Sequence, residues 1–368
     1  MKVIDQCLEN FILQYPIERL CAVEKVLFID IETTGFTARS SNLYLIGCAY
    51  HAEDGWHVIQ WMAENPSEQK DILVAFFSFA EGRRFLIHFN GNQFDLPYLT
   101  QKCAQLELPY DLGCFDGCDV YRRIFPYKAF LKLLNLKQKT IESFLSIHRE
   151  DRFSGGELIA FYQDYVTHPT AETLETLLLH NRDDVIGMLQ ILPILSYFDA
   201  FHDSLTAQKV QANHYLDAEG HRRTELLIYA SLPTPVPKEV SVQTEGLYAR
   251  LCGNELTLRV PVFEEELKYF YSNYKEYYYL PKEDMAMHKS VGSYVDKEHR
   301  ENATARNCYT RKHSLYLREW ELLFTPFFKR SFEDPDLFFE LTDSVKKDPS
   351  TFATYASHVL GHMAKTIS

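Results

Sequence analysis

The alternation of apolar and polar residues predicts two regions of different architecture. In the first region, short apolar runs predict strands, and a 3.6-residue rhythm of apolar positions predicts helices. We expect strands near residues 26–31, 43–50, 56–62 and 84–89. We expect helices near residues 67–80, 93–106 and 157–165, within the segment 120–141, and from about 170 to 193. Mixed strands with helices on both faces of the sheet predict an α/β fold for residues 1–205.

The chain after residue 205 has a different texture. Residues 206–240 are polar and end in the proline-rich stretch LPTPVPKEV, which predicts a linker. Residues 241–280 alternate apolar and polar positions, with Gly253-Asn254 as a predicted hairpin turn. The last forty residues predict one or two helices. We therefore expect a smaller β-rich and helical accessory region over residues 241–368.

The most informative segment is FIDIETTG, residues 28–35, in which an apolar strand ends in two carboxylates. Residues two apart share one face of a strand, so the side chains of Asp30 and Glu32 converge. Two carboxylates on a core strand are costly unless a cation holds them, and Mg2+ or Mn2+ prefers such oxygen ligands. The alternative is that Asp30 caps the following turn and that Glu32 is solvated.

A second candidate carboxylate lies in HFNGNQFDLPYL, residues 88–99. Gly91 permits a tight turn from strand to helix, and Asp95 falls in the first turn of the predicted helix. The helix dipole favours a carboxylate at that place even without a metal, so a simple N-terminal aspartate is the alternative.

The third candidate segment is LLLHNRDDVIGML, residues 177–189. His180 and Asp184 lie four apart, on the face that continues the apolar stripe of the helix. An inward-facing His and Asp need partners, which a metal and an activated water would supply. The alternative is a surface pair of the kind that Asn181 and its neighbours resemble more closely. Asp183 is the rival ligand, but it points about a hundred degrees away.

Together, these segments resemble the DEDD (DnaQ-like) 3′–5′ exonuclease superfamily. The carrying residues are Asp-x-Glu-Thr-Thr-Gly, then Asn-x-x-x-Phe-Asp, then an imidazole before a final Asp. The resemblance implies a ribonuclease H-like fold with two metal ions, Mg2+ or Mn2+, held by Asp30, Glu32, Asp95 and Asp184. It implies that Asp30 bridges both ions, that Glu32 and Asp184 complete the water-activating site, and that Asp95 serves the second ion through water.

Residues from about 25 to 195 resemble, more narrowly, the bacterial YprB-like ribonuclease H-like domain. The resemblance rests on HFNGNQFD, DVYRRIFP, LKLLNLKQKTIE, the RxDRFSGGEL segment and the HNRDD helix. One feature departs from the superfamily. Its branches have either a His with four intervening residues before the final Asp, or a Tyr with three. Here a histidine, His180, stands at the tyrosine spacing, with three intervening residues before Asp184. It is still the best available general base, because imidazole titrates near neutrality.

Candidate contacts to nucleic acid come from two places. Thr33 and Thr34 flank the first motif and Asn90 lies in the second, although a loop-forming role is equally expected for Asn90. Residues 120–141 contain no acidic residue and carry six cations: Arg122, Arg123, Lys128, Lys132, Lys137 and Lys139. Cations interleaved with aromatic residues are typical of a single-strand track. The alternative is an amphipathic helix in which Leu131, Leu133, Leu134 and Leu136 pack inward, and both interpretations fit a core helix pair beside the cleft.

Composition favours a cytoplasmic enzyme with two domains. Eight cysteines without a CxxC pair predict reduced thiols rather than a disulfide scaffold or a zinc site. The N-terminus has a single lysine before Asp5 and Glu9, and its apolar stretch is broken by Pro16 and Glu18, which predicts neither a signal peptide nor a membrane span. A net charge of −13 argues against a surface that attracts nucleic acid generally.

These observations favour an active exonuclease on single-stranded DNA or RNA ends. Two alternatives stay open. The acidic surface and the spacing of His180 favour a nucleic-acid-binding scaffold with little or no hydrolysis. A structure-selective endonuclease is the other alternative, because ribonuclease H-like folds support both outcomes.

Overall fold

The computed structural model describes residues 1–149, 153 and 155–367. The chain divides into two compact units, residues 1–198 and 199–367. Each unit has its own six-stranded sheet, and the second also has a small three-stranded sheet. The segment Arg149 to Leu158, which contributed to the family resemblance, lies partly outside the described residues.

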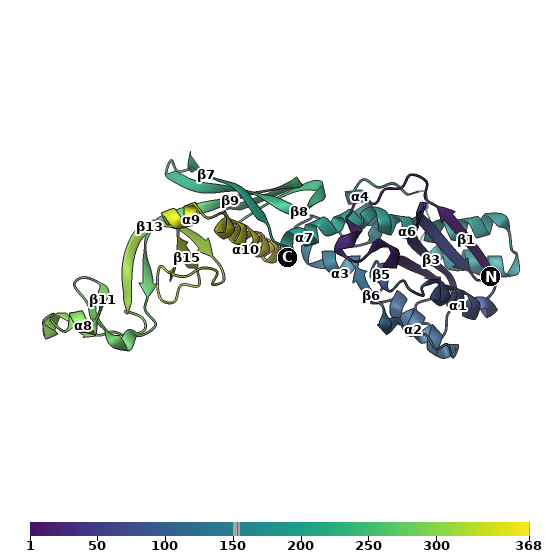
Figure 1. Ribbon diagram of the computed structural model, residues 1–368, viewed down its shortest axis with the longest axis horizontal. Coiled ribbons are helices and arrows are strands. Elements are labelled where there is room, and N and C mark those ends of the chain that lie inside the picture. The colour runs from purple at the N-terminus through teal and green to yellow at the C-terminus, as the bar shows by residue number, and fades with distance from the viewer. Residues whose placement is uncertain (150–152, 154, 368) are drawn as a thin grey trace. The chain divides into compact units, whose positions relative to one another are not determined.

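The first unit is built on a six-stranded mixed sheet in the order β1-β4-β3-β2-β5-β6 (Figure 1). Its strands are β1 (Lys2–Cys7), β2 (Val26–Thr33), β3 (Leu43–Ala52), β4 (Gly55–Met62), β5 (Phe85–His88) and β6 (Asp116–Asp119). The meander from β2 to β4 is antiparallel, whereas β2, β5 and β6 run parallel. The strands predicted near residues 26, 43, 56 and 84 are therefore confirmed. Strands β1 and β6 were not predicted, because both are short, polar edge strands.

Helices flank this sheet, which confirms the predicted α/β fold class (Figure 1). They are α1 (Gln69–Phe79), α2 (Asp95–Gln105), α3 (Val120–Ile124), α4 (Gln138–Phe144), α5 (Gly155–Thr167), α6 (Ala171–Ile191) and α7 (Leu195–His202). By length and hydropathy alone, the stretch Ala171–His202 would be long enough to cross a membrane. However, 72% of its most apolar window is buried inside the protein, as in a core helix.

Strand β2 sends alternate side chains to opposite faces of the sheet. Leu27, Ile29 and Ile31 join the core beneath α1 and α2. Asp30 and Glu32 point to the other face, where they meet residues of α6. This period of two is what places both carboxylates on one side of a strand whose other side is fully apolar.

The basic block between the second and third motifs is not a continuous helix. Helix α3 ends at Ile124, a 3-10 turn covers Phe125–Tyr127, and α4 begins at Gln138. Leu131, Leu133 and Leu136 are buried as predicted, but Leu134 is 90% exposed. The prediction of an inward stripe that includes Leu134 is therefore wrong, because residues between the two helices do not follow a helical period.

The second unit contains a sheet in the order β14-β15-β13-β9-β8-β7. Its strands are β7 (Thr206–Leu216), β8 (Arg222–Thr244), β9 (Leu247–Phe270), β13 (Tyr309–Glu319), β14 (Phe327–Phe328) and β15 (Leu337–Glu340). Residues 206–240, for which we predicted a linker, instead form β7 and most of β8. The prolines misled the prediction, because they lie at shifts in the β8–β9 register rather than in a free segment.

The turn between β8 and β9 also differs from the prediction. Glu245 and Gly246 both have positive φ, 48° and 80°, as a two-residue hairpin turn requires. Gly253, predicted as the hairpin turn, has a φ of 54° but lies inside β9. The true turn lacks the Gly-Asn pair on which the prediction relied.

The rest of the second unit is small elements and one long helix. A three-stranded sheet contains β10 (Tyr277–Leu280), β11 (Met285–His288) and β12 (Glu301–Asn302). The helices are α8 (Lys289–Gly292), α9 (Asp343–Lys346) and α10 (Pro349–Ile367), and α10 packs on β7 and β8. The short 3-10 helices of the chain are Ile17–Arg19, Val23–Lys25, Pro66–Glu68, Leu112–Cys114, Phe125–Tyr127, Leu192–Ile194, Tyr274–Glu276 and Lys297–His299. The prediction of one or two C-terminal helices is confirmed.

Candidate metal centre

The site begins with a row of three residues across neighbouring strands. Asp30 on β2 pairs with Gly47 on β3, which pairs with Gln60 on β4. Because Gly47 has no side chain, a space opens between the two flanking polar residues. A Cβ atom at this position would overlap the side-chain oxygen of Asn181. The absence of a side chain at Gly47 therefore leaves a gap that a side chain of α6 fills.

Asn181 fills the gap at Gly47 and holds Asp30 in place. It is fully buried, at 0% exposure, and its amide donates to the Asp30 carboxylate at 2.9 Å. Gln60 in turn donates to the Asn181 side-chain oxygen at 2.9 Å and to the carbonyl of Leu178 at 2.9 Å. The interpretation of Asn181 as part of a surface pattern is therefore wrong. No local sequence pattern marked Asn181 for this role, because it depends on Gly47 and Gln60 of the strands opposite α6.

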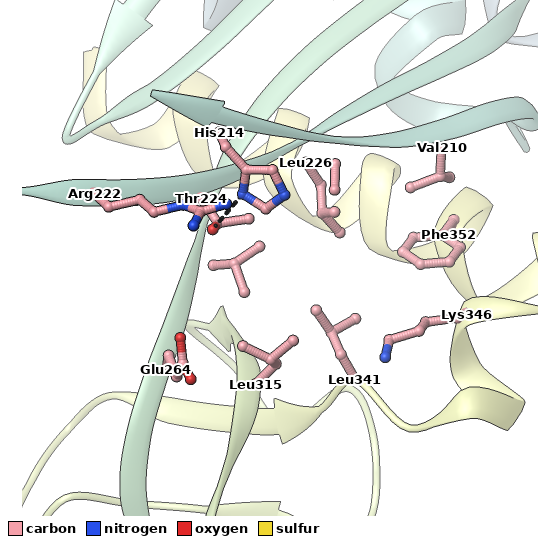
Figure 2. Close-up of a pocket in the computed structure, with 12 residues that line it drawn as sticks. Val210, His214, Arg222, Thr224, Leu226, Glu264, Leu315, Leu341, Lys346 and Phe352 are labelled. Atoms are coloured by element: carbon pink, nitrogen blue, oxygen red, sulfur yellow. Dashed lines mark hydrogen bonds between the residues drawn. The ribbon is translucent and has the colours of Figure 1, made fainter. Parts of the chain in front are cut away.

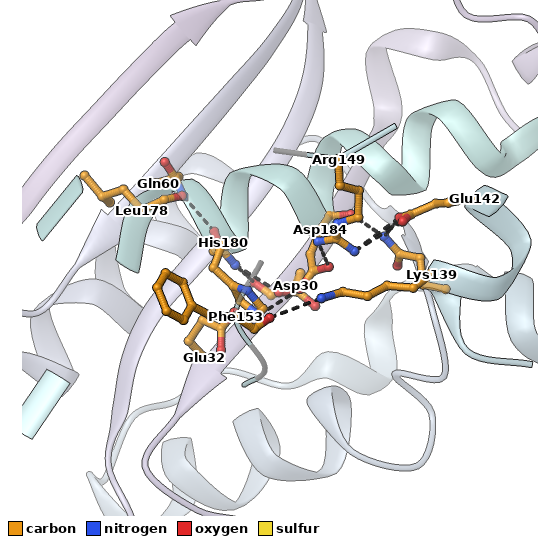
Figure 3. A network of polar contacts seen from close by, with 12 residues as sticks. Asp30, Glu32, Gln60, Lys139, Glu142, Arg149, Phe153, Leu178, His180 and Asp184 are labelled. Atoms are coloured by element: carbon orange, nitrogen blue, oxygen red, sulfur yellow. Dashed lines mark hydrogen bonds and ion pairs between the residues drawn. The ribbon is translucent and has the colours of Figure 1, made fainter. Parts of the chain in front are cut away.

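His180 lies between two carboxylates. Its Nε2 atom is 3.3 Å from Asp184 Oδ2 and 3.6 Å from Glu32 Oε1 (Figure 3). One ligand atom from each of these three residues can be chosen so that all lie within 4.8 Å of one another. His180 and Glu32 are buried, whereas the side chain of Asp184 keeps 21% exposure. The structure thus joins the first and third motifs at one place.

Asp95, the first residue of α2, brings in the second motif. Burial raises the pKa of Asp95 to about 7, against the effect of backbone hydrogen bonds at Asp95 and Ile31. The nearby carboxylates of Asp119 and Asp184 raise it further. Asp95 is therefore close enough to the third motif to be repelled by it.

Asp30 is the electrostatic centre of the group. Burial raises the pKa of Asp30 well above its ordinary value, and the carboxylates of Asp184, Glu32 and Asp95 act in the same direction. The hydrogen bond from Asn181 lowers the pKa of Asp30 and so opposes them. The structure therefore brings all four predicted acidic residues together from β2, α2 and α6.

This donor set fits a divalent cation. Carboxylate oxygens with one imidazole are ligands that Mg2+ and Mn2+ accept, and thiolates are absent from the described group. The mutual repulsion around Asp30 is the energetic sign of the fit, because a cation would remove it. Asp30, Glu32, Asp95 and Asp184 are therefore the residues that could hold a divalent cation here.

Two residues of α4, Gln138 and Glu142, lie next to Asp184 and were not predicted as part of the site. Gln138 donates to the backbone carbonyl of Asp184 at 2.9 Å and to Glu142 at 3.0 Å. Glu142 is paired with Arg149, which also reaches Asp184 (Figure 3). Gln138 lies in the predicted basic block and Glu142 directly follows it, and the sequence analysis assigned neither residue to the site.

The predicted nucleic-acid contacts divide into three groups. The hydroxyl of Thr33 donates to the Gly35 carbonyl at 2.9 Å, and the hydroxyl of Thr34 accepts from the Asn42 amide at 2.8 Å, so both shape their own loop. Asn90, Arg122 and Lys128 line cavities described below. Arg123 instead packs over the ring of Phe198, with its guanidinium carbon 4.9 Å from the ring centroid.

Two cavities share Asn90, Tyr121 and Phe125 in their walls. One, of about 550 Å3, is also lined by Lys128 and by Gln138, whose side chain donates to the backbone carbonyl of Asp184. The other, of about 390 Å3, is also lined by Arg122 and by Asp119, the neighbour of Asp95. Phe125 is 59% exposed, and its ring centroid lies 5.9 Å from that of Tyr121. Aromatic and cationic groups thus stand beside the acidic cluster.

The loop that carries Asn90 is held rigidly. Asp119 accepts hydrogen bonds from the amides of Asn90 at 2.9 Å and Arg122 at 3.2 Å. Asn90 has a φ of 61°, and its side-chain oxygen is buried without a hydrogen-bond partner among the described residues. Both the loop-forming role and an exposure to ligand through the cavities fit this residue.

A further cavity, of about 640 Å3, lies within the second unit. Figure 2 shows Leu226, Leu315, Leu341 and Phe352 around it, with Arg222 and Lys346 at its margin. The hydroxyl of Thr224 lies 3.0 Å from Nδ1 of His214 at one side. None of the residues predicted for the site lines it.

Comparison with known proteins supports the fold. Residues 27–196 match a family model described as the RNase_H superfamily. The match covers all four acidic residues and agrees with a ribonuclease H-like fold for this region. No protein with a curated functional description matches the chain.

Among solved structures, the chain is similar to a family B DNA polymerase from the hyperthermophilic archaeon Pyrobaculum calidifontis. The identity is 18%, the TM-score is 0.38, and the similarity covers 48% of this chain and 26% of the polymerase chain. At this TM-score the similarity supports no conclusion about function.

The raised pKa of Asp95 predicts a pH-dependent stability of the metal-free protein. Between the ordinary pKa of 3.8 and about 7, the unfolded chain has lost the Asp95 proton while the folded chain keeps it. The free energy of unfolding should therefore fall as pH rises through this window. One pKa unit corresponds to about 1.4 kcal/mol, so the contribution is on the order of a few kcal/mol.

The measurement is urea unfolding of chelator-treated protein at pH 5 and pH 8, for the wild type and Asp95→Asn. The variant should be the more stable of the two at pH 8 and lose that advantage at pH 5. Glu53→Gln, at an exposed turn, is the control and should not change the pH dependence. An equal pH dependence in wild type and Asp95→Asn would contradict the prediction.

The close approach of Asn181 to Gly47 predicts the effect of adding a methyl group at residue 47. Gly47→Ala should displace Asn181 and destabilise the first unit by about 1–3 kcal/mol, the usual cost of overpacking a core. Gly156→Ala on α5 is the matched control, because no described atom lies within 4 Å of its Cβ position. Thermal unfolding would compare the two variants. A Gly47→Ala protein as stable as the control would show that the fold does not require the gap at residue 47.

Proposed function

We propose that this protein is a metal-dependent 3′–5′ exonuclease of the DEDD type, with a YprB-like domain, that acts on the ends of single-stranded DNA or RNA in the cytoplasm. The observation that carries the proposal is the convergence of Asp30, Glu32, Asp95 and Asp184 from three separate segments. The match of residues 27–196 to the RNase_H superfamily supports the general reaction class. The polarity rests on the motif resemblance.

The proposed chemistry assigns each residue a task. Asp30, Glu32 and Asp184 supply oxygen ligands on one side, and Asp95 supplies them on the other. When bound, two divalent ions would lower the barrier by stabilising the attacking and leaving oxygens of the phosphodiester. Asn181 keeps the Asp30 carboxylate in one orientation through its 2.9 Å hydrogen bond.

His180 is the proposed general base. Its Nε2 atom faces Glu32 and Asp184, so a water near these carboxylates would lie within its reach. An imidazole near neutrality can accept the proton that an attacking water must lose. The arrangement supports this role despite the tyrosine-like spacing, because the four-residue step on α6 keeps both side chains on one face.

The cavities beside Asn90 support a single-stranded substrate. Phe125 and Tyr121 offer ring faces on which bases can stack, while Arg122 and Lys128 offer positive charge to phosphates. The net charge of −13 makes such a local track more important, because a net negative charge opposes the general attraction of phosphates. We therefore infer that the track, rather than the whole surface, selects the substrate.

Substitution of the acidic residues tests the hydrolysis. Asp30→Asn and Asp184→Asn should abolish turnover while leaving the protein folded, because each removes a charge that the ions require. Asp183→Asn is the matched control, since it changes the neighbouring carboxylate, which points about a hundred degrees away on α6. All four proteins would be incubated with Mg2+ or Mn2+ and with single-stranded DNA and RNA oligonucleotides labelled at either end.

A ladder of mononucleotides shortening from the 3′ end, lost with chelator and in both variants, is the expected result. Discrete internal products would identify the endonuclease alternative. Binding of the oligonucleotides without cleavage under any metal would identify the scaffold alternative. Shortening from the 5′ end would refute the proposed polarity while keeping the reaction class.

Replacement of the proposed base should have a smaller effect. His180→Ala should lower kcat by about 100- to 10,000-fold, the usual range for general-base catalysis. Metal binding measured by calorimetry should persist. A fully active variant would remove His180 from the mechanism.

Removal of the exposed aromatic ring should affect substrate binding rather than the chemical step. Phe125→Ala should raise KM for a single-stranded oligonucleotide by roughly tenfold, because stacking on one base contributes about 1–3 kcal/mol. The kcat should stay near the wild-type value. Tyr294→Ala, at an 89% exposed aromatic residue of the second unit, is the control. An unchanged KM for Phe125→Ala would place the track elsewhere.

A further inference from the structure

Arg149 makes a short cationic contact with the acidic cluster. Its Nη2 atom is 2.5 Å from Asp184 Oδ1, and its Nη1 atom is 3.3 Å from Glu142 Oε1 (Figure 3). The side chain of Arg149 is only 10% exposed. The guanidinium therefore bridges a proposed metal ligand, Asp184, and a second carboxylate, Glu142, for which the sequence analysis predicted no role.

Glu142 is built into the fold as the anchor of this arginine. It is 1% exposed on α4, and Gln138, one turn earlier, donates to its Oε1 atom at 3.0 Å. Gly187 on α6 leaves the necessary room, because a Cβ atom there would overlap Glu142 Oε1 and lie 2.7 Å from Gln138 Nε2. A buried carboxylate without a cation is costly, so Glu142 depends on Arg149.

The two oxygens of Asp184 face different side chains. Oδ1 accepts from Arg149, while Oδ2 lies 3.3 Å from His180 on the side of Glu32. A divalent ion at the cluster needs oxygen from the same carboxylate, and its charge would repel the nearby guanidinium. Arg149 and the ion therefore draw on one group.

We propose that Arg149 is the internal counter-ion of the acidic site and competes with the divalent cation for Asp184. In the metal-free protein it neutralises Asp184. When the ion binds, the guanidinium yields Asp184 and remains paired with Glu142. This inference rests on the proposed function, because it requires that the acidic cluster binds a divalent cation.

The proposal predicts opposite changes in metal affinity for two substitutions. Arg149→Met should bind Mn2+ more tightly, on the order of tenfold, which corresponds to about 1.4 kcal/mol. Its metal-free form should melt at a lower temperature, because Asp184 and Glu142 lose their shared cation. Glu142→Gln should bind Mn2+ more weakly than the wild type, because loss of the Glu142 charge removes an attraction that draws Arg149 away from Asp184. Arg149→Lys, which keeps the charge, should lie close to the wild type.

The experiment is a calorimetric titration of the full chain with Mn2+, after removal of metal, alongside thermal unfolding with and without Mn2+. Arg182→Met is the matched control, since Arg182 lies on the same helix as Asp184 and its guanidinium bonds to Gln6 at 3.2 Å. The control should keep the wild-type affinity. If Arg149→Met does not fold, the sign of the change in Glu142→Gln still decides the question.

Three results would overturn the inference. Weaker Mn2+ binding by Arg149→Met would show that the arginine orients Asp184 for the ion instead of competing with it. Affinities of Arg149→Met or Glu142→Gln within twofold of the wild type would show that the pair does not act on the metal site. A wild-type protein that binds no Mn2+ would refute the proposed function itself, and with it this inference, and is distinguishable from the first two results.

Discussion

Repulsion among carboxylates is the constraint on which the site depends. Asp30 sits within reach of the charges of Asp184, Glu32 and Asp95, in surroundings that already oppose ionisation. Such a cluster lowers the stability of any fold that holds it without a cation. The features around it, including a glycine without a side chain, a buried asparagine and a buried glutamate–arginine pair, are arrangements that make the cluster tolerable before any ion arrives.

The sheet and α6 together solve the positional part of this problem. The period of two along β2 gives one face to apolar core and the other to Asp30 and Glu32. The gap at Gly47 lets α6 approach that polar face closely enough for Asn181 to reach Asp30. The same approach brings His180 and Asp184 to Glu32. A single missing side chain on β3 therefore allows the first and third motifs to meet.

The sequence was sufficient for the α/β core and for grouping the four acidic residues, because both follow from local periods and from motif spacing. It was not sufficient for Asn181, Gln60 or Glu142. Their roles depend on which strand row or helix face lies opposite, and that is a tertiary fact with no local pattern. The supposed linker failed for a related reason. Leu226, Ile228, Ala230 and Leu232 alternate inward along β8, but the prolines that follow hid this period.

Two different hydrogen-bond donors hold carboxylates of the cluster: one is neutral and the other is charged. Asp30 is held by the amide of Asn181, which donates a hydrogen bond without carrying a charge and so leaves the attraction for a cation intact. Asp184, whose side chain keeps 21% exposure, is held by a guanidinium, whose full charge stabilises the carboxylate but opposes an incoming ion. The neutral amide of Asn181 leaves the charge of Asp30 available to a cation. The guanidinium of Arg149 would compete with a cation for Asp184. The buried carboxylate of Glu142 binds the same guanidinium and so affects how strongly Arg149 holds Asp184.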